Sequence, residues 1–178
     1  INDFAILSPI NNDPNYPNYE ISSDNKNINE NIISVDYVDG FSMLINKENF
    51  KDEDFFDESF FLYLENTDLC LRTKKRGQNI FIIKNSFINH SGAGSIVSKD
   101  LEYLRNWHWM WSKFYFNKKH YGYFNAFSKI ITNLLSAIFK YIFYLILFNS
   151  YKRNIYLMRI CGLYNSIIGK KSWFRIDA

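Results

Sequence analysis

The stretch "FFLYLENTDLCLRTKKRG", Phe60 to Gly77, decides which class of fold the sequence favours. Its aromatic run leads directly into two acids, Glu65 and Asp68, and three basic residues precede the glycine. Acids suit the positive end of a helix dipole, basic residues suit its negative end, and glycine suits the residue just past the last turn. The pattern therefore predicts a helix from Glu65 to Arg76.

The segments around this helix predict strands. Residues 3–9, 35–47 and 79–90 are rich in β-branched and aromatic side chains. Residues 10–34 are rich in Asn, Asp and Pro without an apolar period, which predicts a long exposed loop. Gly40 lies inside the second strand, where a glycine often marks a bulge or a close approach of backbone to a ligand. Strands interleaved with a helix give the fold class α/β.

Charge divides the chain into two parts. Residues 1–98 hold eight Lys and Arg against fifteen Asp and Glu, a balance of −7, whereas residues 99–178 hold thirteen against three, a balance of +10. The second part also changes to helical periodicity, so we expect two domains with a boundary near residue 98. A basic, aromatic half suggests an anionic partner, either membrane or nucleic acid. Cys70 and Cys161 provide no disulfide framework, which favours a reducing compartment.

The segment 127–148 is long enough to span a bilayer, which takes roughly 20 residues. One face of its helix carries a polar stripe, which consists of Lys129, Asn133, Ser136, Lys140 and Tyr144. A stripe with two lysines favours a helix lying in the interface, with apolar side chains in the acyl boundary and lysines at anionic head groups. A spanning helix shielded by another helix, and an amphipathic pair in a soluble core, are the alternatives. Nucleic acid is disfavoured because the basic residues alternate with aliphatic runs.

The acids of the opening stretch have two interpretations. On a helix, Glu65, Asp68 and Arg72 fall within an arc of about 60°. They suit an ordinary N-terminal acid and an ion pair between residues four apart. Alternatively, the aromatic run places Glu65 on the floor of a cleft, where a carboxylate accepts a proton from a hydroxyl nucleophile or holds a sugar hydroxyl. His90, at the end of a predicted strand, is either structural or a metal ligand.

Four segments follow one another in a distinctive order: "VDYVDGFSMLINKENF", "FDESFFLYLENTDLCLRTKKRG", "NIFIIKNSFINHSGAGS" and "RNWHWMWSKFYF". In order, spacing and glycine placement, residues 35–116 resemble family 2 glycosyltransferases, specifically the bacterial rhamnosyltransferase-like branch that builds surface polysaccharides. The basic tail up to "GLYNSIIGKK" is similar to the membrane-associating C-terminus of that branch. The resemblance implies a partial GT-A fold, with residues 1–98 as the acceptor side of the catalytic domain and residues 99–178 as basic amphipathic helices.

The resemblance also implies an activity. Family members transfer a sugar from a nucleotide-sugar donor, with inversion, to an acceptor that is often lipid-linked. By this likeness, Asp39 and Gly40 would line the acceptor side, and Glu65 and Asp68 would occupy the catalytic acidic motif. The expected location is the cytoplasmic face of the bacterial inner membrane, as a peripheral protein.

Two further residues receive roles from the same likeness. His90 would ligate a divalent metal, Mg²⁺ or Mn²⁺, together with an Asp-x-Asp pattern that holds the sugar diphosphate. Arg105 would face the diphosphate or the acceptor. The family's N-terminal half, which carries the Asp-x-Asp, has no counterpart in these 178 residues. The resemblance therefore implies a C-terminal portion that does not turn over alone.

The chain departs from the family at Asn66. The commonest form of the acidic motif has a second acid at this position, usually taken as the catalytic base. An amide does not accept a proton, so Asn66 would contribute to substrate binding, and the base would be Glu65 or Asp68. An alternative from another class is a non-catalytic membrane-surface binding module, or a decayed or split transferase.

Overall fold

The computed structural model describes residues 3–21, 27–51, 55–90 and 98–176. The chain divides into two compact units. The first, here called the sheet unit, consists of residues 1–57 and 65–94, and the second, the helical unit, of residues 58–64 and 95–178. The chain thus passes from the sheet unit into the helical unit at residue 58 and returns at residue 65.

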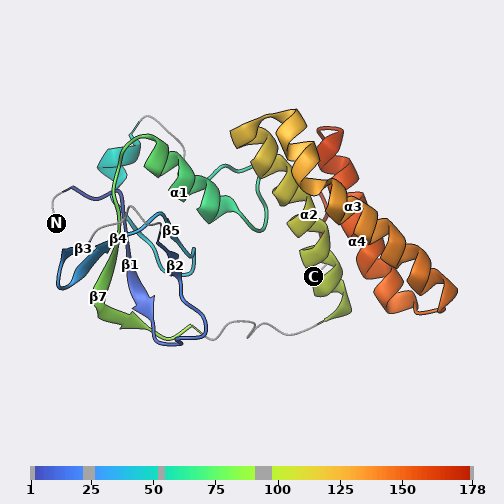
Figure 1. Ribbon diagram of the computed structural model, residues 1–178, viewed down its shortest axis with the longest axis horizontal. Helices are drawn as coiled ribbons and strands as arrows, with labels where there is room; N and C mark the ends of the chain where they lie inside the picture. Colours follow the sequence, from blue (N-terminus) through green and yellow to red (C-terminus); the bar gives the residue numbers. More distant parts are fainter. Residues whose placement is uncertain (1–2, 22–26, 52–54, 91–97, 177–178) are drawn as a thin grey trace. The chain divides into compact units, whose positions relative to one another are not determined.

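The sheet unit contains a five-stranded mixed sheet with the strand order β3-β4-β7-β1-β6 (Figure 1). Its strands are β1 (Ile6–Asn11), β3 (Asn27–Asn29), β4 (Ile32–Ser34), β6 (Leu44–Ile45) and β7 (Ile80–Ile88). β1 and β7 run parallel, and the other neighbours pair antiparallel. A second sheet pairs β2 (Tyr19–Glu20) with β5 (Tyr37–Val38). The α/β class expected from the sequence is confirmed.

Two predicted segments differ from the structure. The exposed loop predicted over residues 10–34 is wrong, because it contains β2, β3, β4 and the end of β1. These three strands are only two or three residues long, too short for an alternating pattern to emerge from an Asn-rich stretch. The strand predicted over residues 35–47 is interrupted by a turn at Gly40, which separates β5 from β6. A 3₁₀ helix, η1 (Lys47–Phe50), follows.

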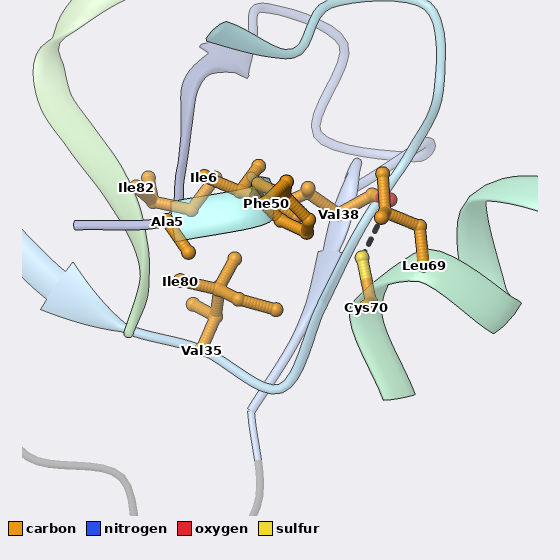
Figure 2. Packing of buried hydrophobic residues seen from close by; sticks show 9 residues of the cluster. All are labelled: Ala5, Ile6, Val35, Val38, Phe50, Leu69, Cys70, Ile80 and Ile82. Atoms are coloured by element: carbon orange, nitrogen blue, oxygen red, sulfur yellow. Dashed lines mark hydrogen bonds between the residues drawn. The ribbon is translucent and has the colours of Figure 1, made fainter. Parts of the chain in front are cut away.

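The predicted helix of the opening stretch is confirmed as α1 (Glu65–Lys75), and it is followed by Gly77 in a left-handed conformation with φ of 72°. Its buried side packs into the core of the sheet unit, which Figure 2 shows as Ala5, Ile6, Val35, Val38, Phe50, Leu69, Cys70, Ile80 and Ile82. The Cys70 thiol donates to the Val38 carbonyl at 3.8 Å. Burial raises the pKa of Cys70 to about 11, so the thiol is protonated and inert at neutral pH.

The helical unit contains the helices expected beyond residue 98: α2 (Lys99–Tyr121), α3 (Tyr123–Ile146) and α4 (Ser150–Ile167) (Figure 1). The Ser98 side chain caps α2 by accepting from the Leu101 N–H at 3.1 Å. Gly122, with φ of 84°, ends α2 and allows α3 to begin at once. The inner face of α2 carries Trp107, Met110 and Phe114, which are all buried.

α2 and α4 approach each other backbone to backbone at Gly162. A Cβ atom added to Gly162 would lie 2.1 Å from the carbonyl oxygen of Trp107 and 2.9 Å from its carbonyl carbon. Real carbon and oxygen atoms do not come this close without bonding. Only a glycine therefore permits this helix crossing.

Replacing Gly162 with Ala tests this contact, and the sign of the effect is diagnostic. In an unconstrained helix the change stabilises by about 1 kcal/mol. Here overpacking against backbone should instead destabilise the helical unit by about 1–3 kcal/mol. All four tryptophans, Trp107, Trp109, Trp111 and Trp173, belong to this unit, so denaturant unfolding followed by their fluorescence isolates it.

Tyr164→Ala serves as the control, because Tyr164 is 59% exposed on the same helix. We expect a change within about 0.5 kcal/mol for this variant. A Gly162→Ala protein as stable as the wild type would contradict the close approach of the two helices.

Candidate functional site

The backbone is strained where α1 begins. Tyr63 and Leu64 have φ of 68° and 69°, the left-handed region that costs L-residues roughly 1–2 kcal/mol each. Such strain persists only where surrounding contacts enforce it, and it often occurs at functional sites. Within the helical unit, the Ser112 hydroxyl donates to the Leu62 carbonyl at 2.7 Å, and the Tyr63 ring meets Trp109 edge to face. α1 begins directly after this sharp turn, at Glu65.

Three of the predicted site residues lie together in the sheet unit. The Asn66 amide donates to the Tyr37 hydroxyl at 2.8 Å and to the Val38 carbonyl at 3.3 Å. The Tyr37 hydroxyl in turn donates to the Asp39 carboxylate. At Gly40, an added Cβ would lie 3.2 Å from Asn66 Cβ, so the turn packs tightly against the start of α1.

Tyr37 is the member of this cluster that sequence reasoning missed. Burial, followed by the hydrogen bond to Asp39, raises the pKa of Tyr37 and keeps the phenol protonated. The available signal was its spacing from Asp39, because residues two apart in an extended segment lie on the same side. Hydrogen bonds link the Asn66 amide, the Tyr37 phenol and the Asp39 carboxylate in series, so Asp39 accepts from a neutral donor.

Glu65 differs from the other acids in its surroundings. Its Oε2 atom is buried and has no hydrogen-bond partner among the described residues. A buried carboxylate oxygen without a donor can accept a hydrogen bond from a hydroxyl group of a ligand. Glu65 directly precedes Asn66, which contacts Tyr37 and the turn at Gly40.

Asp68, in contrast, is held in an ion pair. Its side chain is fully buried, and Oδ2 accepts from Arg72 Nε at 2.8 Å. Arg72 also donates from Nη2 to the Phe55 carbonyl at 2.6 Å, which ties α1 to the preceding segment. Of the two interpretations of this acid, the geometry favours the structural one, in which Asp68 positions α1.

His90 lies on an aromatic surface. Its ring stacks on Phe41 at 4.0 Å between centroids, with planes 9° apart, and a tilted Tyr16 ring lies at 6.2 Å. The backbone N–H of His90 donates to Asn11 Oδ1 at 3.2 Å. Because Phe41 follows Gly40 directly, His90 adjoins the predicted acceptor-side turn through this ring. No group of three or more His, Cys, Asp or Glu side chains suited to a metal occurs in the described part of the chain.

Arg105 belongs to the helical unit, not to the unit that holds the other predicted site residues. It lines a small hollow of about 220 Å³ with Tyr63, Asn106, Trp109 and Arg159. Arg159 donates from Nε to Asn106 Oδ1 at 2.7 Å. The hollow therefore carries two guanidinium groups, one of which is fixed by an amide.

Part of the polar stripe of α3 contacts the other helices of its unit, whereas Lys129, Ser136 and Lys140 are exposed. Lys113 of α2 donates to Asn133 at 3.1 Å, and the Tyr144 ring stacks on Tyr156 of α4 at 5.6 Å. The opposite side of α3 is exposed and apolar. Its large exposed side chains are Phe124, Phe127, Leu135, Ile138, Phe139, Ile142, Phe143, Leu145 and Ile146.

α3 covers most of residues 127–148, for which the sequence left three alternatives. α3 is long and apolar enough to cross a membrane, and among the described residues no other helix meets that criterion. Only 11% of the most apolar 18-residue window of α3 is buried in this structure. A continuous exposed apolar face of this size marks an interaction surface.

Comparisons with protein-family models, curated proteins and solved structures find no match to this chain.

Removing Arg72 tests the structural assignment of Asp68. Arg72→Met leaves a fully buried carboxylate without its cation, which typically costs 3–5 kcal/mol. Because the Arg72 side chain keeps 18% exposure, we expect a loss of about 2–3 kcal/mol in the sheet unit. In a Cys161→Ser background, alkylation of buried Cys70 across a denaturant series reports the stability of this unit alone.

Two variants frame this measurement. Asp68→Asn combined with Arg72→Met should recover part of the loss, because the buried charge is gone. Lys74 lies on the same helix as Arg72 and forms a partly exposed ion pair with Asp36. Lys74→Met should therefore cost less than about 1 kcal/mol. An Arg72→Met effect no larger than that of Lys74→Met would refute a structural ion pair.

Proposed function

We propose that this chain is the acceptor-side portion of an inverting family 2 glycosyltransferase. Its reaction would move a sugar from a nucleotide-sugar donor to a lipid-linked polysaccharide acceptor at the cytoplasmic face of the bacterial inner membrane. The observation that carries the proposal is the buried Oε2 of Glu65, which has no hydrogen-bond partner among the described residues and belongs to the residue before Asn66 in the cluster of Tyr37, Asp39, Gly40 and Asn66. The family resemblance supports it from the sequence.

The chemistry requires a base near the acceptor hydroxyl. An inverting transfer forms a bond from the acceptor oxygen to the sugar carbon while the bond to the diphosphate breaks, and the hydroxyl proton must go to a base. Glu65 Oε2 is free to accept this proton. Asp39, held by Tyr37, and the Asn66 amide would orient the acceptor hydroxyls.

The metal belongs to the same proposal. His90 would give one nitrogen ligand to a divalent ion, and the stack on Phe41 fixes its ring plane for that purpose. The other ligands would come from the Asp-x-Asp pattern that the resemblance assigns to another part of the enzyme. When bound, such an ion neutralises charge on the departing diphosphate.

Membrane attachment is the second part of the proposal. The apolar side of α3 would lie in the interface of the bilayer, since it is exposed along the whole helix. This face also supports the alternative function, a membrane-surface module without catalysis. The two functions share the surface and differ only in whether Glu65 reacts.

Glu65→Gln tests the base assignment. The substitution preserves shape but removes the proton acceptor, so sugar transfer should fall about a hundredfold or more. The assay follows radiolabelled sugar from the nucleotide donor into lipid extract, in the complete gene product that carries these residues. Glu48→Gln is the matched control, because Glu48 is an exposed acid of the same unit. Near-normal transfer by Glu65→Gln would remove Glu65 as base, and transfer that is absent in the wild type would favour the membrane module.

Phe139→Glu tests the membrane face. Phe139 is 70% exposed on the apolar side of α3, and burying a Phe side chain in an apolar phase contributes about 1.5–3 kcal/mol. Flotation with anionic vesicles should therefore weaken about tenfold or more. Ser136→Glu adds the same charge one turn earlier on the stripe side and should float like the wild type. Equal losses in both variants would show that charge, not the apolar face, governs attachment.

A further inference from the structure

A cavity of about 570 Å³ lies within the helical unit, apart from the residues assigned to sugar transfer. Its walls come from the C-terminal half of α2, the end of α4 and the segment that follows α4. Four cationic side chains line it, and these are Lys118, Lys170, Lys171 and Arg175. Glu58 is the one acid among the lining residues, and among the described residues no carboxylate forms an ion pair with the four cations. The cavity thus concentrates uncompensated positive charge in a concave space.

The wall after α4 is fixed to α2 by hydrogen bonds. The Trp111 indole donates to the Lys170 carbonyl at 2.9 Å, and the buried Ser166 hydroxyl donates to the Trp111 carbonyl at 2.9 Å. Gly169, with φ of 77°, allows the chain to turn between these two anchors. The two lysines that follow are therefore presented from a held backbone and not from a loose tail.

Arg175 is held even more firmly. Its guanidinium lies 3.5 Å over the Phe61 ring, and Nη1 donates to the carbonyls of Ser172 and Phe174 at 2.9 and 2.8 Å. The Ser172 hydroxyl meets His108 Nδ1 at 2.9 Å, while His108 Nε2 meets the Phe174 carbonyl at 2.8 Å. The carbonyl requires an N–H at Nε2, so Nδ1 accepts from the serine. Among the described residues, no hydrogen bond involves Nε or Nη2 of Arg175.

We propose that this cavity binds a phosphorylated group, a phosphate monoester or a diphosphate. A fixed guanidinium offers paired N–H donors that match phosphate oxygens, and flexible lysines add point charges around it. The volume falls in the range of ligand pockets and exceeds the size of a single phosphate, so the bound group would carry a substituent. The inference does not rest on sugar transfer, because none of its residues belongs to the Glu65 site.

The phosphate could be borne by a lipid or by a soluble molecule. Lys118 lies four residues before Gly122, the point where apolar α3 begins. Ile167, at the end of α4, packs against the buried cluster that contains Ile130 of α3. The cavity is therefore at the end of the helical unit where α3 starts. A head group at a bilayer that α3 contacts would be near the cavity, and the experiment separates the two sources.

The test compares two double variants of the full chain that remove equal charge. Lys170→Gln with Lys171→Gln removes two lysine charges from one wall of the cavity. Lys99→Gln with Lys152→Gln removes two exposed lysines of the same unit that do not line it. One arm titrates inorganic pyrophosphate by calorimetry, and the other floats the protein on phosphatidylcholine vesicles that contain phosphatidic acid.

We expect the cavity variant to bind about tenfold more weakly in at least one arm, with the control within about twofold of the wild type. Selective loss for pyrophosphate identifies a soluble ligand, and selective loss only on vesicles identifies a lipid phosphate. Lys118→Gln, on the opposite wall, should reproduce the loss and guards against a local folding defect. Equal losses in both double variants, or no saturable binding in either arm, would overturn the proposal.

Discussion

The arrangement of the candidate site depends on how residues 58–64 are anchored in the helical unit. Phe60 packs with buried Trp107 and Trp111, and the Leu62 carbonyl accepts from Ser112. The chain must then return to the sheet unit within a few residues. It does so through two consecutive left-handed residues, whose strain the aromatic packing offsets. Because the turn takes only these two residues, α1 begins immediately after it, at Glu65.

Directional contacts with α2 and α4 explain how α3 is held in the helical unit. In a soluble bundle the apolar side of a helix packs inward and the polar side faces water. Here the stripe of Asn133, Lys140 and Tyr144 meets α2 and α4, and lysine ammonium groups lie over aromatic rings. Amide, ammonium and ring contacts are directional, so they can hold a helix while its apolar face remains free. The packed side of α3 also buries Ala126, Ile130 and Ala137, so the helix is apolar both where it packs and where it is exposed.

Much of the fold could be predicted because its strongest signals are local. The helix after Leu64, the long strand β7 and the three basic helices follow from caps and from periodicity over many residues. The short strands before residue 35 could not be predicted, because each is defined by its partner and not by its own pattern. For the site, the sequence brought together Asp39, Gly40 and Asn66, but it could not choose between Glu65 and Asp68. That choice depends on Arg72 and Phe55, which fix Asp68 through tertiary contacts.

The amide at position 66 is consistent with its surroundings in a way that an acid would not be. The Val38 carbonyl accepts from both the Asn66 amide and the Cys70 thiol, and the Tyr37 hydroxyl accepts from the same amide while it donates to Asp39. A carboxylate has no hydrogen to offer to Val38, and it would compete with Asp39 for the single Tyr37 proton. Two acids facing one phenol would raise the cost of ionising either of them. Asn66, Tyr37 and Asp39 therefore form one consistent set of hydrogen bonds, which an acid at position 66 would disrupt.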